Sequence, residues 1–199
     1  KTHNAFWKSN NYSFTDKENT SGCIYIVRDP RNVITSVKNH FQTDNIENAF
    51  RFIKDDKKLI GVSKENNAQF DLPTVISSWD NHYNSWKKLD TNYLLIKYEN
   101  LLKEPLVEFQ KICKFLEKLS GIKFDDKKIY SSMKSVEFDK LKKQESLVGF
   151  KEAPKPKNNK TIKFFYLGPN NDWKKLLKLE TIKLIENNFK SEMKELGYL

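Results

Sequence analysis

A short apolar run that passes directly into a helical pattern constrains the fold of this chain most strongly. The run GCIYIV (residues 22–27) is rich in β-branched and aromatic side chains, and Ser21 and Asp29 bound it, as is typical of a buried parallel strand. Asp29 is also a good N-cap, and Pro30 is a good first helical residue. Apolar side chains then recur at helical spacing, at Val33, Ile34, Val37 and Phe41. A strand that feeds a helix at once predicts an α/β unit.

Later segments repeat this alternation of strand and helix. YLLIKY (93–98) is a second apolar run, and a helical pattern follows it over 104–119. An aromatic stripe at 76–86 predicts an amphipathic helix before that second strand. The last helical pattern runs over 179–193, and Gly197 is its expected C-cap. Strands that alternate with helices favour an α/β fold with a mostly parallel central sheet flanked by helices.

Two polar segments interrupt the alternation. Residues 42–72 are rich in Asn, Asp and Lys, with a short helix predicted at 46–53, and we expect an insertion over the sheet edge. Residues 146–163 combine Lys, Pro and Asn without periodicity and predict a loop. Loops of this kind often cover a substrate, so both segments are expected to set specificity.

The charge balance is strongly basic. Lys and Arg number 36 against 26 Asp and Glu, so the formal net charge is +10. The resulting positive potential attracts anions such as nucleotides, nucleic acids, membrane surfaces and sulfated or phosphorylated substrates. The lysines are spread among the acids rather than gathered into one stripe, which favours solvated helix faces. We therefore expect no nucleic-acid partner, and a basic nucleic-acid-binding protein is the least favoured alternative.

Cysteine usage and hydropathy indicate the cellular setting. Cys23 and Cys113 lie in apolar patterns, without disulfide or metal-ligand spacing, and are expected to be buried thiols in a reducing compartment. No apolar run approaches the roughly 18 residues of a membrane-spanning helix, and no leader pattern opens the chain. We expect a cytoplasmic protein without a metal. The chain begins at Lys1 rather than Met, and we expect a segment to precede it.

The arginines mark a candidate anion site. The chain contains three, and Arg28 and Arg31 lie at the first strand-to-helix junction. A guanidinium is a planar, permanently charged, bidentate donor that suits phosphate or carboxylate. In open α/β sheets, ligands bind beyond the carboxyl ends of the strands, at the N-terminus of the following helix. Arg28 has this position, and Ser36 can add a hydroxyl from about two helical turns further on. The alternative is that Arg28 only pairs with a local acid such as Asp29.

Five motifs, in order, resemble the landmarks of one enzyme family. They are KTHNAF, IYIVRDPRNVITS, SSWDNHYNSW, LLIKYENLLKEP and GPNNDWKK. Their order and separations are similar to those of sulfotransferases that use 3′-phosphoadenosine 5′-phosphosulfate (PAPS). The resemblance covers essentially residues 1–199 and implies a single sulfotransferase domain with a P-loop-NTPase-like three-layer fold. The family's Gly-rich loop for the 5′-phosphosulfate has no match here, so we expect the domain to be incomplete at its N-terminus.

The resemblance implies roles at the nucleotide. Arg28 and Ser36 would hold the 3′-phosphate of PAPS and of its product 3′-phosphoadenosine 5′-phosphate (PAP), and Arg31 would be a neighbouring salt-bridge or surface partner. Tyr98 matches the family tyrosine that contacts adenine. Phe138 matches an aromatic residue that stacks on the base. Both aromatic residues are also compatible with core positions.

The resemblance also implies a catalytic pair. His3 would be the general base that takes the acceptor's proton, and Lys1, on the same face of an extended segment, would neutralise charge near the transferred group. Histidine ordinarily titrates close to neutral pH, which suits this task. The implied reaction is in-line sulfuryl transfer from PAPS to a hydroxyl or amine of a small-molecule or carbohydrate acceptor, without a metal. His40 and His82 are expected to be structural, with His82 packed between tryptophans.

The family pattern is broken near the C-terminus. The family commonly has Arg-Lys-Gly before Gly-Asp-Trp, whereas this chain has YLG (166–168) and then NDW (171–173). Two phosphate-binding cations are thus replaced. Gly168 can still offer its backbone N–H, and Lys163 and Lys174 are the candidates to substitute for the cations.

Two consequences of these departures are left open by the sequence. The short dimer motif of vertebrate cytosolic members is not recognisable at 174–183, so the oligomeric state cannot be carried over. A catalytically degenerate member that binds nucleotide or carbohydrate without turnover is the main alternative function.

Overall fold

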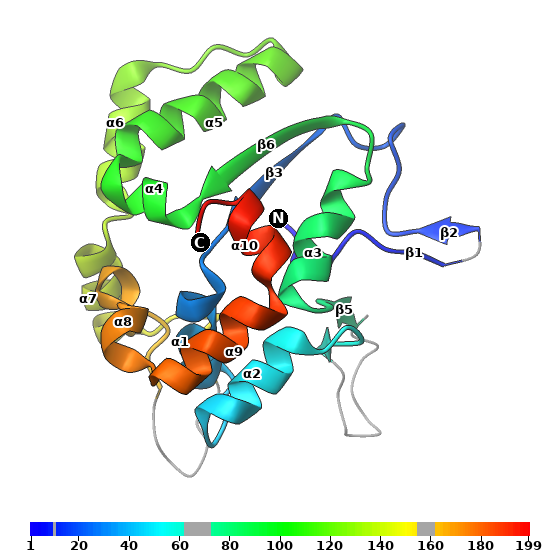
Figure 1. Ribbon diagram of the computed structural model, residues 1–199. Coiled ribbons are helices and arrows are strands. Elements are labelled where there is room, and N and C mark those ends of the chain that lie inside the picture. The colour runs from blue at the N-terminus through cyan, green and yellow to red at the C-terminus, as the bar shows by residue number, and fades with distance from the viewer. Residues whose placement is uncertain (10, 62–72, 155–161) are drawn as a thin grey trace, which may run out of the picture.

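The computed structural model describes residues 1–9, 11–61, 73–154 and 162–199, which form a mixed arrangement of helices and strands (Figure 1). At its centre, β3 (Gly22–Val27) and β6 (Asn92–Lys97) pair in parallel, from Gly22 opposite Asn92 to Val27 opposite Lys97. Both predicted strands are confirmed, although the second one ends at Lys97 and Tyr98 begins a helix.

The other strand pairs among the described residues are short and antiparallel. β1 (Lys8–Ser9) pairs with β2 (Tyr12–Ser13), and β4 (Leu59–Ile60) pairs with β5 (Thr74–Val75). Helices flank the parallel pair, as the predicted α/β class requires. Their bounds are α1 (Pro30–His40), α2 (Ile46–Lys54), α3 (Trp79–Lys87), α4 (Tyr98–Lys103), α5 (Pro105–Ser120), α6 (Asp126–Ser135), α7 (Phe138–Val148), α8 (Trp173–Leu176), α9 (Leu179–Asn188) and α10 (Lys190–Glu195).

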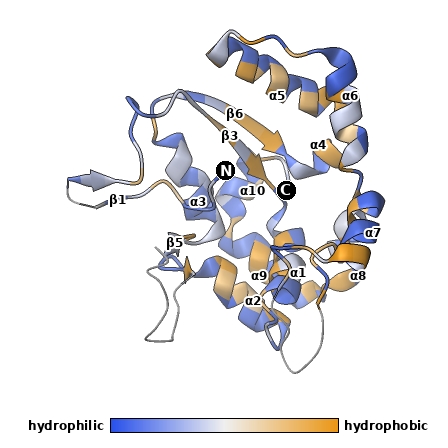
Figure 2. Ribbon diagram, turned by 180° about the vertical axis from the view of Figure 1, so that it is seen from behind, coloured by the Kyte–Doolittle hydropathy of each residue, from blue (hydrophilic) through white to orange (hydrophobic). Residues whose placement is uncertain are grey.

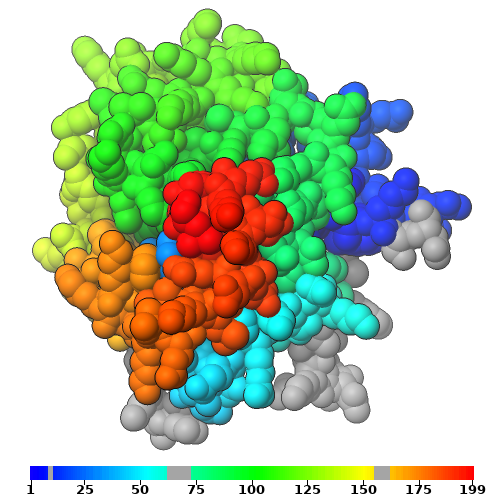
Figure 3. All heavy atoms as spheres, viewed as in Figure 1, coloured from blue at the N-terminus to red at the C-terminus, as the bar shows by residue number. Residues whose placement is uncertain are grey.

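Helices cover both faces of the β3–β6 pair and give three layers. Successive side chains of a strand point to opposite faces. On one face, Gly22 lies close to Phe115 and Leu119 of α5. On the other face, Val27 clusters with Tyr83 of α3 and with Leu196, the residue after α10. Apolar residues concentrate on the two strands (Figure 2). At the surface, the C-terminal residues, which include α10 and are red in Figure 3, lie between the orange residues of α8 and α9 and the green residues of the middle of the chain.

Helix α1 begins as the sequence predicts. Asp29 caps it by accepting a hydrogen bond from the Arg31 N–H at 2.9 Å, and Pro30 occupies the first turn. The helix then buries one face in the main apolar core. This core joins α1 to α2, α9 and α10 through Ile34, Val37, Ala49, Phe50, Ile53, Leu177, Ile185, Phe189 and Met193.

The polar segment after α1 is not simply a cover for the sheet edge. The short helix predicted at 46–53 is present as α2, capped by the side chain of Asn45. However, its buried Ala49, Phe50 and Ile53 belong to the core with α1. The expectation of an insertion over the sheet edge is therefore wrong for α2, because its apolar stripe needs a packed partner. Residues 62–72 of this segment lie outside the described residues.

Two other predicted helices have different bounds. The aromatic helix begins at Trp79 rather than at residue 76, because the N–H groups of Ile76 and Ser77 both donate to the carbonyl of Lys58, at 2.9 and 3.0 Å. Ser77 also has a φ of 60°. The C-terminal pattern is divided at Phe189 into α9 and α10.

The loop predicted at 146–163 is also partly wrong. Helix α7 continues through Val148, so the segment begins in helical structure. Residues 155–161 lie outside the described residues.

The expected burial of the thiols holds for Cys113, whereas Cys23 is only half-buried. Burial nonetheless raises the pKa of the Cys23 thiol to about 11. Among the described residues, no helix is long and apolar enough to cross a membrane.

Arg31 forms a salt bridge, as predicted, but it is buried rather than at the surface. Its side chain is 7% exposed and binds Asp29 at 2.7 Å and Glu186 of α9 at 2.6 Å. Its guanidinium also donates to the backbone carbonyl of Tyr198 at 2.8 Å and lies 3.9 Å from the ring centroid of Trp173. Arg31 thus joins α1 to the C-terminal helices.

Replacing Arg31 with lysine should therefore destabilise the fold. An ammonium cannot reproduce the forked contacts, and breaking a buried ion-pair network costs about 3 kcal/mol. Urea unfolding measures this loss as a lower midpoint at unchanged slope. The matched control is Arg51→Lys, since Arg51 is exposed and should change stability by less than about 0.5 kcal/mol. Equal stability of the two variants would contradict a structural role for the Arg31 contacts.

Candidate functional site

Three residues predicted to contact the nucleotide meet at the carboxyl ends of the parallel strands. Arg28 follows β3 directly, and its Nη1 donates to the Ser36 Oγ of α1 at 3.2 Å. Tyr98 follows β6 as the first residue of α4, and its ring centroid lies 4.3 Å from the Arg28 guanidinium carbon. Because the two strands are parallel and adjacent, their ends bring Arg28 and Tyr98 to one edge.

The electrostatics of Arg28 favour an external anion. The local acid that could have paired with it, Asp29, binds Arg31 instead. Glu99 accepts hydrogen bonds from the Asp29 N–H and the Tyr198 hydroxyl, at 2.9 Å each. Within the described part of the chain, the buried Nε of Arg28 has no hydrogen-bond partner, and burial lowers the pKa of this guanidinium. A buried unpaired donor on a cation is costly, so this arrangement fits a bound phosphate.

Phe138 and Gly168 also lie together. Phe138 is the first residue of α7, and a Cβ on Gly168 would lie 2.2 Å from one of its ring atoms. Helix α7 makes a second contact with the segment before Gly168. The buried carboxylate of Glu145 accepts hydrogen bonds from the backbone N–H groups of Phe164 and Phe165, at 2.6 and 3.1 Å. The structure thus pairs these two predicted residues, and their role toward a base or phosphate stays a prediction.

The substitution Gly168→Ala should disturb this contact. Gly168 has a φ of 50°, which side chains rarely adopt, and the added methyl group would overlap the Phe138 ring. We expect a loss of about 2 kcal/mol in the free energy of unfolding. Thermal unfolding measures it, and Gly149→Ala is the control with strain but without overlap, since a Cβ there meets nothing within 4 Å. An equal loss in both variants would show that the Phe138 contact contributes nothing.

His82 does not pack between tryptophans, so this prediction is wrong. Its Nδ1 is 2.7 Å from the Tyr25 hydroxyl, and its Nε2 is 3.3 Å from the backbone carbonyl of His3. Burial lowers the pKa of His82, which favours the neutral ring. A neutral ring satisfies both contacts when Nε2 donates to the carbonyl and Nδ1 accepts from the hydroxyl. His82 is structural, as predicted, and it anchors the segment that carries the predicted base.

The predicted catalytic pair lies at the exposed N-terminal segment. Lys1 Nζ is 3.4 Å from the Glu152 carboxylate, and both side chains are exposed. Burial lowers the pKa of His40, at the end of α1, while Glu152 opposes this shift and the exposed His3 adds to it. His3, His40 and Glu152 therefore share one electrostatic neighbourhood.

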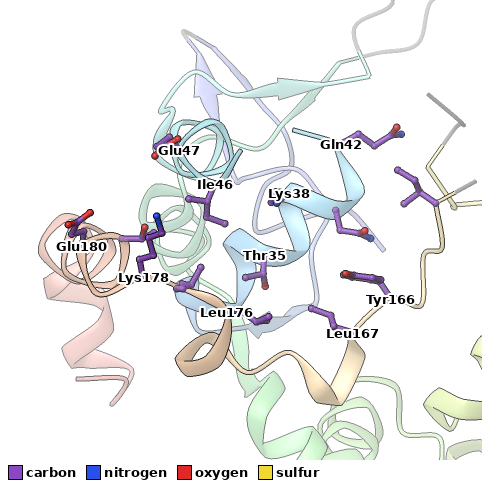
Figure 4. Close-up of a pocket in the computed structure, with 14 residues that line it drawn as sticks. Thr35, Lys38, Gln42, Ile46, Glu47, Tyr166, Leu167, Leu176, Lys178 and Glu180 are labelled. Atoms are coloured by element: carbon purple, nitrogen blue, oxygen red, sulfur yellow. The ribbon is translucent and has the colours of Figure 1, made fainter. Parts of the chain in front are cut away.

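A cavity of about 480 Å³ adjoins the candidate phosphate site, since Thr35, the neighbour of Ser36 in α1, lines it (Figure 4). It is open to solvent on one side and is lined by α1, α2, the segment before Gly168 and the α8–α9 region. Tyr166 and Leu167, which stand where the family pattern has cations, line it, whereas Arg28 and Ser36 do not. Of the two candidate substitutes, Lys174 is exposed with its Nζ 5.6 Å from the Trp173 ring centroid. The backbone carbonyl of the other, Lys163, accepts from the side chain of Asn39.

The sequence did not identify Asn171, which contacts the candidate phosphate site. Its side chain reaches Asn32, Thr35 and Ser36 of α1. The only signal was its place in the NDW stretch, where the family pattern is broken. For Tyr25, too, the sequence indicates only a strand position, because its partner His82 is distant in sequence.

Comparisons with known proteins agree with this architecture. The family model of the sulfotransferase domain matches residues 1–197. Sulfotransferase 1B1 of the dog, Canis lupus familiaris, is 28% identical over 180 residues, which is 88% of this chain and 56% of the relative. The chain thus spans little more than half of that relative's length.

Solved structures show the same fold. Mouse sulfotransferase SULT7A1, complexed with PAP, matches with a TM-score of 0.56 and 22% identity, over 85% of this chain and 58% of that one. Retinol dehydratase, in complex with androsterone and inactive cofactor PAP, matches with a TM-score of 0.56 and 21% identity, over 86% of this chain and 47% of that one. At these identities the matches establish the fold.

Proposed function

The chain belongs to the sulfotransferase family, and we propose that it transfers a sulfuryl group from PAPS to a hydroxyl or amine of an acceptor. The observation that carries this proposal is the half-buried Arg28 side chain at the end of β3. Its Nε is unpartnered within the described residues, and Ser36 and Tyr98 lie against it. A dianionic 3′-phosphate supplies the acceptor oxygens that such a group lacks.

On the nucleotide side, the proposed roles divide among four further residues. Ser36 donates its hydroxyl to the 3′-phosphate. Tyr98 contacts the adenine ring, and Phe138 stacks on it. Gly168 offers its backbone N–H to the phosphate. The packing of Phe138 against Gly168 supports the joint placement of the last two.

On the acceptor side, His3 takes the proton and Lys1 stabilises charge. PAPS supplies the sulfuryl group, whose bond to the leaving phosphate oxygen breaks as the acceptor oxygen or nitrogen bonds to sulfur, leaving PAP. The acceptor's proton passes to a ring nitrogen of His3. The pair of Lys1 with Glu152 is exposed and therefore weak, so Lys1 can exchange this partner for the transferred group. Fixed positive charge and positioning account for most of such catalysis.

We also propose that residues 1–199 form one sulfotransferase domain. The C-terminal helices share a core with α1 and α2, and Arg31 joins α1 to α9 and to the chain end. The acceptor is proposed to be a small molecule or a carbohydrate, and the net charge of +10 favours an anionic one. We further propose that the protein does not bind nucleic acid.

A sulfuryl-transfer assay tests this function. The whole product of the gene that encodes this chain is incubated with radiolabelled PAPS and pools of phenolic, aliphatic, amine and carbohydrate acceptors. We expect labelled product from at least one pool, with PAP formed in equal amount. PAP binding without product from any pool would favour the degenerate alternative, which the loss of the cations at 166–167 also favours. The absence of both PAP binding and labelled product would overturn the proposal.

A further inference from the structure

Asn171 is a buried polar residue whose orientation is fixed by its neighbours. It is 7% exposed and lies beside α1. Its Nδ2 donates to the backbone carbonyl of Asn32 at 3.0 Å and to Ser36 Oγ at 3.2 Å, and its Oδ1 accepts from Thr35 Oγ1 at 2.7 Å. A carbonyl oxygen can only accept, so the amide group next to Asn32 must be the NH₂. The contact with Ser36 is therefore a donation from Asn171.

This donation determines what the Ser36 hydroxyl can do. A hydroxyl has two lone pairs and one hydrogen. Arg28 Nη1 and Asn171 Nδ2 both lie 3.2 Å from Ser36 Oγ, and both groups can only donate. Together they occupy both lone pairs. The hydroxyl can then act only as a donor.

The internal acceptor for that hydrogen is poor. The Asn32 carbonyl lies 3.4 Å from Ser36 Oγ and already accepts a hydrogen bond from Asn171 Nδ2 at 3.0 Å. The first distance exceeds that of an ordinary O–H···O hydrogen bond. The Ser36 hydrogen is thus free to turn to an anion held by Arg28.

We propose that Asn171 is a positioning residue that makes Ser36 an obligate donor to the 3′-phosphate of the nucleotide. This role rests on the proposed function. The side chains at 166 and 167 bring no cation to this site and line the neighbouring cavity instead. A neutral amide that commits the Ser36 hydroxyl to donation makes up part of that deficit, and it gives selectivity for nucleotides that carry a 3′-phosphate.

The substitution Asn171→Asp tests this role. A carboxylate can only accept, so it would take the Ser36 hydrogen and repel the phosphate. Calorimetry measures the affinities of PAP and of 5′-AMP, which lacks the 3′-phosphate. We expect the variant to bind PAP about 30-fold more weakly and 5′-AMP less than about threefold more weakly. Asn170→Asp, at the exposed neighbouring residue, is the control and should alter PAP affinity less than about threefold.

A second variant guards against misfolding. Asn171→Gly removes the same contacts without adding charge, and we expect about a fivefold loss that is selective for PAP. Equal losses for PAP and 5′-AMP, or no loss in either variant, would overturn the role of Asn171 while the proposed function stands. If the wild-type protein itself bound PAP no better than 5′-AMP, the proposed 3′-phosphate site would have failed instead.

Discussion

Replacing Arg28 with alanine is expected to weaken PAP binding about 100-fold or more. Arg28 is a half-buried cation at the end of β3, with a buried Nε that has no partner in the described part of the chain and with Ser36 and Tyr98 in contact. A phosphate in this place receives charge-assisted hydrogen bonds in a poorly solvated setting, where each bond contributes about 1.5–3 kcal/mol. Removing the guanidinium leaves the anion desolvated without compensation. Calorimetric titration of PAP measures the loss.

Two comparisons separate this effect from general damage. The affinity for 5′-AMP should change much less, because that nucleotide has no 3′-phosphate. Arg28→Lys should have an intermediate effect, since an ammonium keeps the charge but loses the fork and the stacking on Tyr98. Wild-type affinity for PAP in Arg28→Ala would exclude this residue from the phosphate site.

Replacing His3 with glutamine is expected to lower kcat about 1,000-fold while PAP affinity stays within about twofold of wild type. Glutamine keeps polarity and approximate size but cannot take the acceptor's proton. His82 holds the backbone carbonyl of His3, so the segment should keep its path in the variant. Kinetics on the whole gene product, with PAP calorimetry beside them, measure both quantities.

The neighbouring histidine supplies the matched control. His40 lies at the end of α1 and interacts electrostatically with His3, but it has no proposed chemical role. We expect His40→Gln to reduce kcat less than about tenfold. A larger loss of kcat in His40→Gln than in His3→Gln would show that His40, and not His3, is the base.

Local signals made part of the site predictable. The strand at 22–27, its Asp-Pro junction and the helix after it are encoded within one short stretch, so Arg28 and Ser36 could be placed together in advance. Asp29 and Pro30 determine where α1 begins, and helical geometry alone then brings residue 36 near residue 28.

Contacts between distant segments were not predictable in this way. Asn171 reaches Ser36 only because the C-terminal helices pack on α1, and His82 meets Tyr25 and His3 only through the packing of α3 on β3. Helix α2 was recognised from its own periodicity, yet its burial against α1 depends on the assembled core. Periodicity indicates that an apolar stripe needs a partner without identifying that partner.

Calorimetric titration of wild-type protein with PAP and with 5′-AMP tests the central claim most directly. If Arg28 and Ser36 form a 3′-phosphate site, PAP should bind with micromolar affinity, and 5′-AMP should bind at least about 30-fold more weakly. Equal affinities for the two nucleotides, or no binding of PAP, would contradict the account.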